Sequence, residues 1–267
     1  MKPTHAVRGL RGHQQGFTLV ELSVAVLIGL FLLGGLLSLV QDMRRTFGNQ
    51  NQLAQLQDSE RLAMTLITDV IQAAGYYPNP TLYTITTALP TNALYPAFLA
   101  GQAISGTHNA APPGDTISVQ FLTAPADGII NCTGGSNLTG ANQPYVSKFS
   151  VDALNNLNCT LGTATAIAAP VALISAAPGV VPKSGGVTNM QILYGVTTNT
   201  AAVSNNVDSY LTAPQVTAGN YWNNIICVKV TLTFDNTALH NSQPGQPASI
   251  QFTRVITVMS RGGVNTT

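Results

Sequence analysis

The chain has 267 residues, of which 45% are hydrophobic and only 8% are charged, whereas an ordinary soluble domain carries about 25% charged residues. Eleven Lys and Arg against ten Asp and Glu give a net charge of +1, which argues against a strongly basic nucleic-acid binder. The apolar content is too high for a disordered chain, and the three cysteines allow at most one intramolecular disulfide.

The first forty residues combine a basic leader with a long apolar stretch. Residues 1–16 carry three basic side chains and no acid, and residues 17–40 carry one charge, Glu21. As a helix, the apolar stretch would be about 36 Å long, enough to cross a hydrocarbon core of about 30 Å. By the positive-inside rule, the leader predicts a cytoplasmic N-terminus, with the rest of the chain on the far side of the membrane.

Two common kinds of N-terminal segment could explain the apolar stretch, namely a secretory signal peptide and a plain signal anchor. A secretory signal peptide fits poorly, because its apolar core is only about 7–15 residues long and no small-residue cleavage site follows here. A plain signal anchor fits the length, but Glu21 at mid-depth would then cost about 2.5–3.5 kcal/mol. A charge with such a cost usually has a partner or a purpose in the membrane.

The residues around Glu21 resemble a known processing signal. Residues 16–22, Gly-Phe-Thr-Leu-Val-Glu-Leu, are similar to the class III signal of type IV pilins and type II secretion pseudopilins. The resemblance implies cleavage by a prepilin peptidase between Gly16 and Phe17, N-methylation of Phe17, and a role for Glu21 in filament assembly. In a bundle of such helices, Glu21 can pair with the Phe17 amine of a neighbour, since in apolar surroundings both charges are far better paired than alone.

The apolar stretch continues into an amphipathic one. Apolar side chains recur every three or four residues at Leu53, Leu56, Ala63, Ile67, Val70 and Ala74. This period and the absence of proline predict one continuous helix over residues 17–74, ended by Gly75. Its membrane or filament-core half is residues 17–40, and its amphipathic half, residues 41–75, is expected to pack on a head domain.

Residues 76–267 are expected to form that head. Residues 76–114 are rich in Pro, Thr, Ala and Asn and predict a long loop with a short strand at 82–86. Alternating or β-rich patterns predict strands at 115–122, 145–151, 167–174, 189–196, 224–234 and 249–259. One long helix followed by several strands predicts an α+β fold, with an antiparallel sheet packed on the amphipathic half of the helix.

A second resemblance covers most of the chain and narrows the family to the PilW-type minor pilins. It is carried by residues 57–63, 69–76, 115–121, 186–196, 208–211, Trp222, 227–230, 252–258 and Arg261. Gly262 departs from it, because asparagine is expected after the final arginine. Residues 127–180 resemble no part of the family and are expected to be a variable insert.

The resemblance implies a type IV pilin-like fold and a low-abundance pilin that starts pilus assembly in the bacterial inner membrane, at or near the filament tip. The implied partners are other minor and major pilins, the inner-membrane assembly platform, prepilin peptidase and a large tip adhesin. The implied location is a single-pass inner-membrane protein with a periplasmic head, which also becomes extracellular if the subunit enters the pilus.

The cysteines and the charge balance of the head bear on a disulfide, a reactive thiol and nucleic-acid binding. Cys132 and Cys159 share an Asn-Cys-Thr context, and in an oxidising periplasm a disulfide between them is expected, with two unpaired thiols as the alternative. Cys227 is interpreted as a structural free thiol, since nothing nearby in the sequence would lower its pKa. Residues 76–267 contain five basic and five acidic side chains, so nucleic-acid binding would have little electrostatic drive.

No metal-ligand spacing, cofactor motif or catalytic motif occurs in the sequence. We therefore expect no enzyme, no metal and no cofactor. The alternatives to a type IV pilus subunit are a type II secretion pseudopilin, an adhesin or other binding module at the tip, and an anchored periplasmic enzyme.

Overall fold

The computed structural model of the chain describes residues 16, 18–91, 98–176, 185–199, 206–243 and 245–261. The chain divides into two compact units, residues 1–49 and residues 50–267. Helix α1 (Leu19–Gln72) begins in the first unit and ends in the second. Its residues in the first unit expose nearly all their side chains, so the buried core belongs to the second unit.

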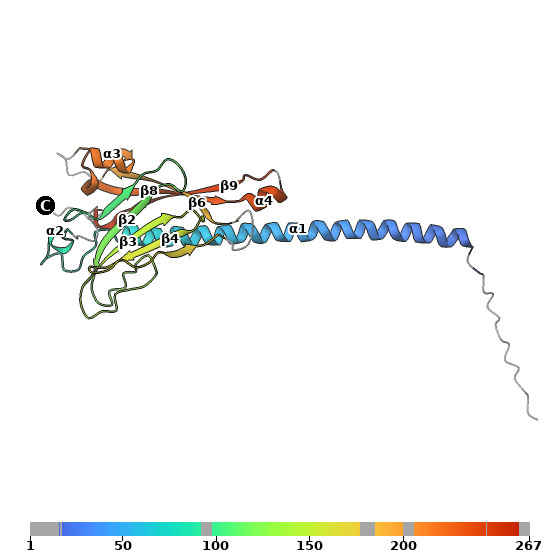
Figure 1. Cartoon of the computed structure of the whole chain (residues 1–267), viewed down its shortest axis with the longest axis horizontal. Helices are drawn as coiled ribbons and strands as arrows, with labels where there is room; N and C mark the ends of the chain where they lie inside the picture. Colours follow the sequence, from blue (N-terminus) through green and yellow to red (C-terminus); the bar gives the residue numbers. More distant parts are fainter. Residues whose placement is uncertain are drawn as a thin grey trace, which may run out of the picture. The chain divides into compact units, whose positions relative to one another are not determined.

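Within the described residues, the second unit contains two antiparallel sheets (Figure 1). The first has the order β1-β2-β3-β4-β5 and consists of β1 (Ile104–Thr107), β2 (Thr116–Thr123), β3 (Gln143–Val151), β4 (Leu157–Gly162) and β5 (Val171–Ile174). The second has the order β7-β6-β8-β9 and consists of β6 (Val187–Val196), β7 (Ser209–Leu211), β8 (Ile225–Asp235) and β9 (Ser249–Thr257). Short helical segments are α2 (Ile85–Ala88), α3 (Ala213–Ala218), η1 (Trp222–Asn224), α4 (Thr237–Ser242) and η2 (Met259–Arg261).

The core of the second unit forms between the last turns of α1 and both sheets. The buried side chains of α1 are Leu56, Ala63, Met64, Ile67, Val70 and Ile71. They pack in one cluster with inward-facing residues of β2, β6 and β8, such as Phe121, Ile192 and Val230. Burying each large aliphatic side chain contributes about 1.5–3 kcal/mol, so this helix face holds the two sheets to α1.

The predicted helix is confirmed in α1, but its buried face starts later than expected. Leu53, which the sequence pattern placed on the buried stripe, is 38% exposed. The reason is that the head covers α1 closely only from Leu56 onward, where the run of buried residues begins.

The two sheets are joined by Asp115, a carboxylate that is only 2% exposed. Its backbone N–H donates to the carbonyl oxygen of Met190 on β6 at 2.7 Å. Its Oδ2 accepts the backbone N–H of Ile192 at 2.7 Å, and its Oδ1 accepts the backbone N–H of Asn109 and contacts His108 Nδ1, both at 2.8 Å. A buried carboxylate is tolerated when donors satisfy it in this way, so Asp115 ties the start of β2 to β6.

Five predicted strands are confirmed as β2, β3, β6, β8 and β9. The strand predicted at residues 82–86 is wrong: this stretch leads into α2, with Thr84 as its N-cap and Thr87 completing a capping box. Threonine is frequent in strands, yet its side chain also satisfies the free N–H groups at a helix start. Only Val171–Ile174 of the strand predicted at 167–174 forms, because Pro170 interrupts it.

The expected single sheet is in fact two sheets. Residues 127–180, expected to be an insert, contribute β3, β4 and β5 to the first of them. These strands are therefore part of the architecture of the head. Whether their sequence varies between relatives stays a prediction.

Candidate functional site

The first turn of α1 places Glu21 at a defined position. Thr18 Oγ1 accepts the backbone N–H of Glu21 at 3.3 Å, and the Thr18 carbonyl oxygen accepts the backbone N–H of Leu22 at 3.2 Å. Thr18 therefore has the bonds of an N-cap, and Glu21 is the third helical residue. The Thr-x-x-Glu spacing is that of a capping box, and an acid in the first turn is favoured by the helix dipole. This spacing is a signal in the sequence that places the start of the helix just after Thr18, whereas the apolar pattern alone predicts a start at residue 17.

The carboxylate of Glu21 is exposed and unpaired. It has no hydrogen-bond or ion-pair partner in the part of the chain that the structure describes. Gly16 is exposed just before the N-cap, whereas Phe17 lies outside the described residues. The geometry thus leaves Glu21 available for a group from elsewhere, and the roles of Gly16 and Phe17 stay predictions.

The helix surface around and beyond Glu21, from residue 19 to 40, is apolar and uncovered. Leu19 is 84% exposed, Phe31 is 83% exposed, and the other large apolar side chains from residue 19 to 40 are also exposed. Among the described residues, α1 is the one helix long and apolar enough to cross a membrane. An exposed apolar surface of this length needs lipid or other apolar helices around it.

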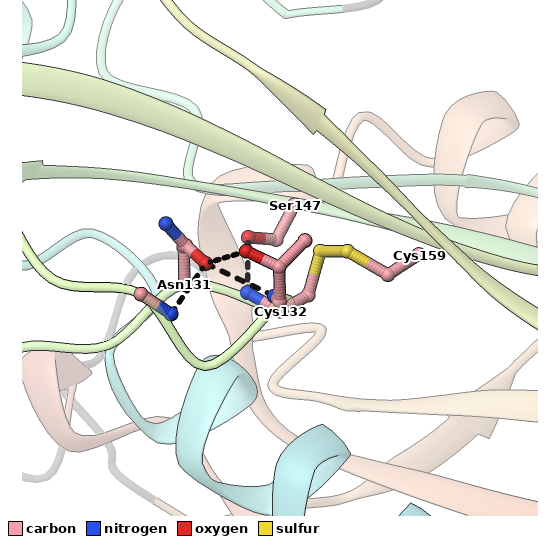
Figure 2. The surroundings of a disulfide bond; sticks show 6 residues. Asn131, Cys132, Ser147 and Cys159 are labelled. Atoms are coloured by element: carbon pink, nitrogen blue, oxygen red, sulfur yellow. Dashed lines mark hydrogen bonds between the residues drawn. A yellow bond between two sulfur atoms is a disulfide. The ribbon is translucent and has the colours of Figure 1, made fainter. Parts of the chain in front are cut away.

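The head contains a disulfide at the loop before β3. Cys132 and Cys159 are bonded through their sulfur atoms, with their Cα atoms 5.8 Å apart (Figure 2). The backbone N–H of Cys132 donates to Ser147 Oγ at 3.2 Å, and Asn131 Oδ1 accepts the backbone N–H of Thr133 at 3.0 Å. Both cysteines are fully buried, so the bond fixes the loop around residue 132 to β4.

Cys227 and two tyrosines of the head are enclosed or hydrogen-bonded. Cys227 is buried and is not in a disulfide, and its Sγ lies 3.6 Å from the hydroxyl oxygen of Tyr210. This hydrogen bond raises the pKa of Tyr210 above its ordinary value. Burial, with a smaller effect from Asp115, raises the pKa of Tyr194 as well, so both phenols stay neutral. In the described ranges, no three His, Cys, Asp or Glu residues come together as metal ligands would.

Trp222, one of the residues that carry the family resemblance, packs against other residues of the head. Its ring meets that of Tyr194 edge to face, with centroids 5.2 Å apart. Its Nε1–H donates to Thr217 Oγ1 at 3.1 Å. Its two roles, ring packing and hydrogen bonding, are therefore contacts within the head.

Two regions of the chain match known family models. Residues 148–260, from the end of β3 into η2, match Type IV Pilus-assembly protein W. Residues 11–37 match the prokaryotic N-terminal methylation motif, and this range includes Gly16, Phe17 and Glu21. The chain has no significant match among curated proteins or among solved structures. The two matches confirm the resemblance to PilW-type minor pilins, and they point to a structural component rather than an enzyme.

Proposed function

We propose that this chain, a pilin related to type IV pili, is cleaved by prepilin peptidase between Gly16 and Phe17 and helps to initiate pilus assembly at the filament tip. The two family matches support the pilin assignment. The observation that carries the proposal further is Glu21, a carboxylate in the first turn of α1 that has no partner among the described residues. The large side chains around it, from residue 19 to 40, are apolar and exposed.

Processing gives Glu21 a partner. Hydrolysis of the peptide bond after Gly16 would leave Phe17 with a positively charged α-amine, which methylation keeps basic. Glu21 lies about one helical turn further along. When apolar helices associate, leaving either charge unpaired is costly, whereas the carboxylate of one subunit and the amine of another satisfy each other. The pair would therefore set the register between neighbouring subunits.

The proposed topology places the two units in different environments. Residues 17–40 would lie in the inner membrane with the basic leader in the cytoplasm, and the head would lie in the periplasm. The Cys132–Cys159 disulfide supports this, because such bonds persist in oxidising compartments. The proposed partners are other minor and major pilins, the inner-membrane assembly platform, prepilin peptidase and a large tip adhesin.

Complementation of a strain that lacks this protein tests the assembly role. Wild-type protein should restore sheared surface filaments, and Glu21→Gln should not, although it accumulates in the membrane. Asp42→Asn is the matched control, since it removes a carboxylate from the same helix beyond the apolar stretch, and it should restore filaments. Full restoration by Glu21→Gln would contradict the proposal.

A type II secretion pseudopilin is the second candidate, because it would carry the same N-terminal methylation motif. The match of residues 148–260 to a type IV pilus-assembly family favours the pilus. The same strains separate the two functions. If filaments persist without the protein while export of secreted enzymes stops, the pseudopilin assignment replaces the pilus one.

A further inference from the structure

A groove lies beside the C-terminal end of α1, within the second unit. It has a cavity volume of about 370 Å³, and its lining includes Asp69, Gln72, Tyr76, Ile129, Ile130 and Met259. Asp69 and Gln72 lie three residues apart on one face of the last turn of α1, and Tyr76 follows in the turn after the helix. We call this feature the α1 groove.

The loop wall of the α1 groove is held in place. The carboxylate of Asp127 accepts the backbone N–H groups of Ile129 at 3.0 Å and of Ala124 at 2.8 Å. Ile130 then forms an antiparallel bridge with Ser136. Cys132, two residues further on, is fixed by the disulfide described above. The apolar side chains of this wall are therefore presented by a rigid loop.

The opposite wall is equally constrained. The carbonyl oxygen of Tyr76 accepts the backbone N–H of Leu122 at 2.8 Å, which ties the turn after α1 to β2. Ser260 Oγ donates to the Ala74 carbonyl oxygen at 2.6 Å, which holds the segment containing Met259 against the same turn. Both walls are thus formed before any ligand arrives, which lowers the entropic cost of binding.

The chemistry of the α1 groove selects a cation with an apolar stem. Asp69 supplies the one carboxylate among its described lining residues, and this carboxylate has no hydrogen bond or ion pair in the described part of the chain. The nearby Arg254 donates to Thr68 Oγ1 instead, at 3.4 Å. An arginine or lysine side chain can lay its methylene groups along the isoleucines, and its charge can interact with Asp69 and with the aromatic ring of Tyr76.

We propose that the α1 groove receives an arginine or lysine side chain, flanked by apolar residues, from a neighbouring subunit of the assembly. The identity of the partner rests on the proposed function, whereas the preference for a basic side chain rests on the groove alone. The chain's own C-terminal residues 262–267, Gly-Gly-Val-Asn-Thr-Thr, contain no basic side chain, so they do not match the charge of Asp69.

A peptide titration tests the groove directly. The full chain in detergent micelles, with ¹³C-labelled methionine and isoleucine methyl groups, is titrated with the tripeptide acetyl-Leu-Arg-Leu-amide and, separately, with acetyl-Leu-Gln-Leu-amide. The methyl resonances of Met259 and Ile129 should shift with the arginine peptide, and the glutamine peptide should bind about fivefold more weakly.

Variants test whether Asp69 causes the preference for the arginine peptide over the glutamine peptide. Asp69→Asn should remove the difference between the two peptides, and Gln72→Lys, which places a competing cation in the groove, should abolish binding of the arginine peptide. Asp58→Asn, at an exposed acid of α1 outside the groove, should behave as wild type. Unchanged methyl resonances elsewhere in the head show that each variant is folded.

Three results would overturn the docking proposal: equal affinity for both peptides, an arginine preference that survives Asp69→Asn, or a shift of Met259 and Ile129 on deletion of residues 262–267 before any peptide is added. The last result would mean that the chain's own tail occupies the groove. Since the titration uses purified protein, its failure leaves the filament experiment with Glu21→Gln unaffected, and the reverse also holds.

Discussion

The acidic residues of this sparsely charged chain have distinct local environments. Asp115 is buried between two sheets and satisfied by several donors. Asp69 faces a groove without a partner in the described residues, and Glu21 is equally unpaired at the start of α1. An acid that is satisfied by donors, as Asp115 is, stabilises the fold. Acids without a partner, such as Asp69 and Glu21, contribute little to stability and are available to bind another molecule. Substitutions at the two kinds of position should therefore fail in different assays.

Asp152, in the turn between β3 and β4, gives a pH-dependent prediction. Partial burial raises its pKa, but hydrogen bonds from the backbone of Asn156 and Leu154 and from the side chains of Asn158 and Asn156 outweigh this, and the pKa falls from 3.8 to about 2. The folded state therefore favours the carboxylate, which stabilises the fold above about pH 4, and this contribution is lost as the pH falls toward 2.

Asp152→Asn should lower the free energy of unfolding at pH 6 by about 1–2 kcal/mol, after allowance for solvent screening. Urea unfolding of both proteins at pH 6 and pH 2.5 measures this. The difference between them should shrink at the lower pH, since the wild-type carboxylate becomes partly protonated there. A difference that stays constant across this range would show that the charge of Asp152 is not the cause.

The disulfide gives a second prediction about stability. The double variant Cys132→Ser/Cys159→Ser should lower the free energy of unfolding by about 2–4 kcal/mol, because the unfolded chain gains freedom when the loop is opened. Urea unfolding with and without a reductant is the measurement. Reductant should bring the wild type to the level of the variant and leave the variant unchanged. A loss below about 1 kcal/mol would mean that the hydrogen bonds of the loop suffice without the bond.

Among the elements, those with a long regular pattern were predictable and the short ones were not. The patterns that predicted α1 and the five confirmed strands extend over seven or more positions, so a single period dominates. β1 and β7 have four and three residues, too few for a period to show. No strand was predicted at β4, which is defined by its pairing with β3 on one side and with β5 on the other.

The candidate sites also differ in how far they could be predicted from the sequence. The signal around Glu21 is local, so its residues could be named from sequence alone. The α1 groove could not, since Asp69 and Ile129 are far apart in the chain and meet only through the packing of the loop before β3 on α1. Likewise, no sequence pattern indicates that Asp115 joins two sheets.

The contact between β1 and β6 gives a prediction at the element scale. A Cβ atom at Gly106 on β1 would collide with Tyr194 Oη on β6 and lie 2.7 Å from the Thr116 carbonyl oxygen. Gly106→Ala should therefore cost about 1–3 kcal/mol of unfolding free energy through overpacking. Gly140→Ala is the matched control, because nothing lies within 4 Å of the added atom there. Equal stabilities of the two variants would contradict this account of the interface.

At the scale of the whole molecule, the two units have different requirements. Residues 19–40 of the first unit expose large apolar side chains and make no core of their own, so this surface requires lipid or other helices. The second unit buries its own core between α1 and two sheets. The two family matches follow this division, since the methylation motif covers the start of α1 and the pilus-assembly family covers β4 to β9.

Mass spectrometry of the mature N-terminus tests the central claim most directly. Sheared filaments and membranes from the same cells are to be compared. We expect the protein in the filament fraction, beginning at N-methylated Phe17 and lacking residues 1–16. A chain that retains residues 1–16 in both fractions would contradict processing, and the protein would then be a membrane-anchored domain outside the pilus.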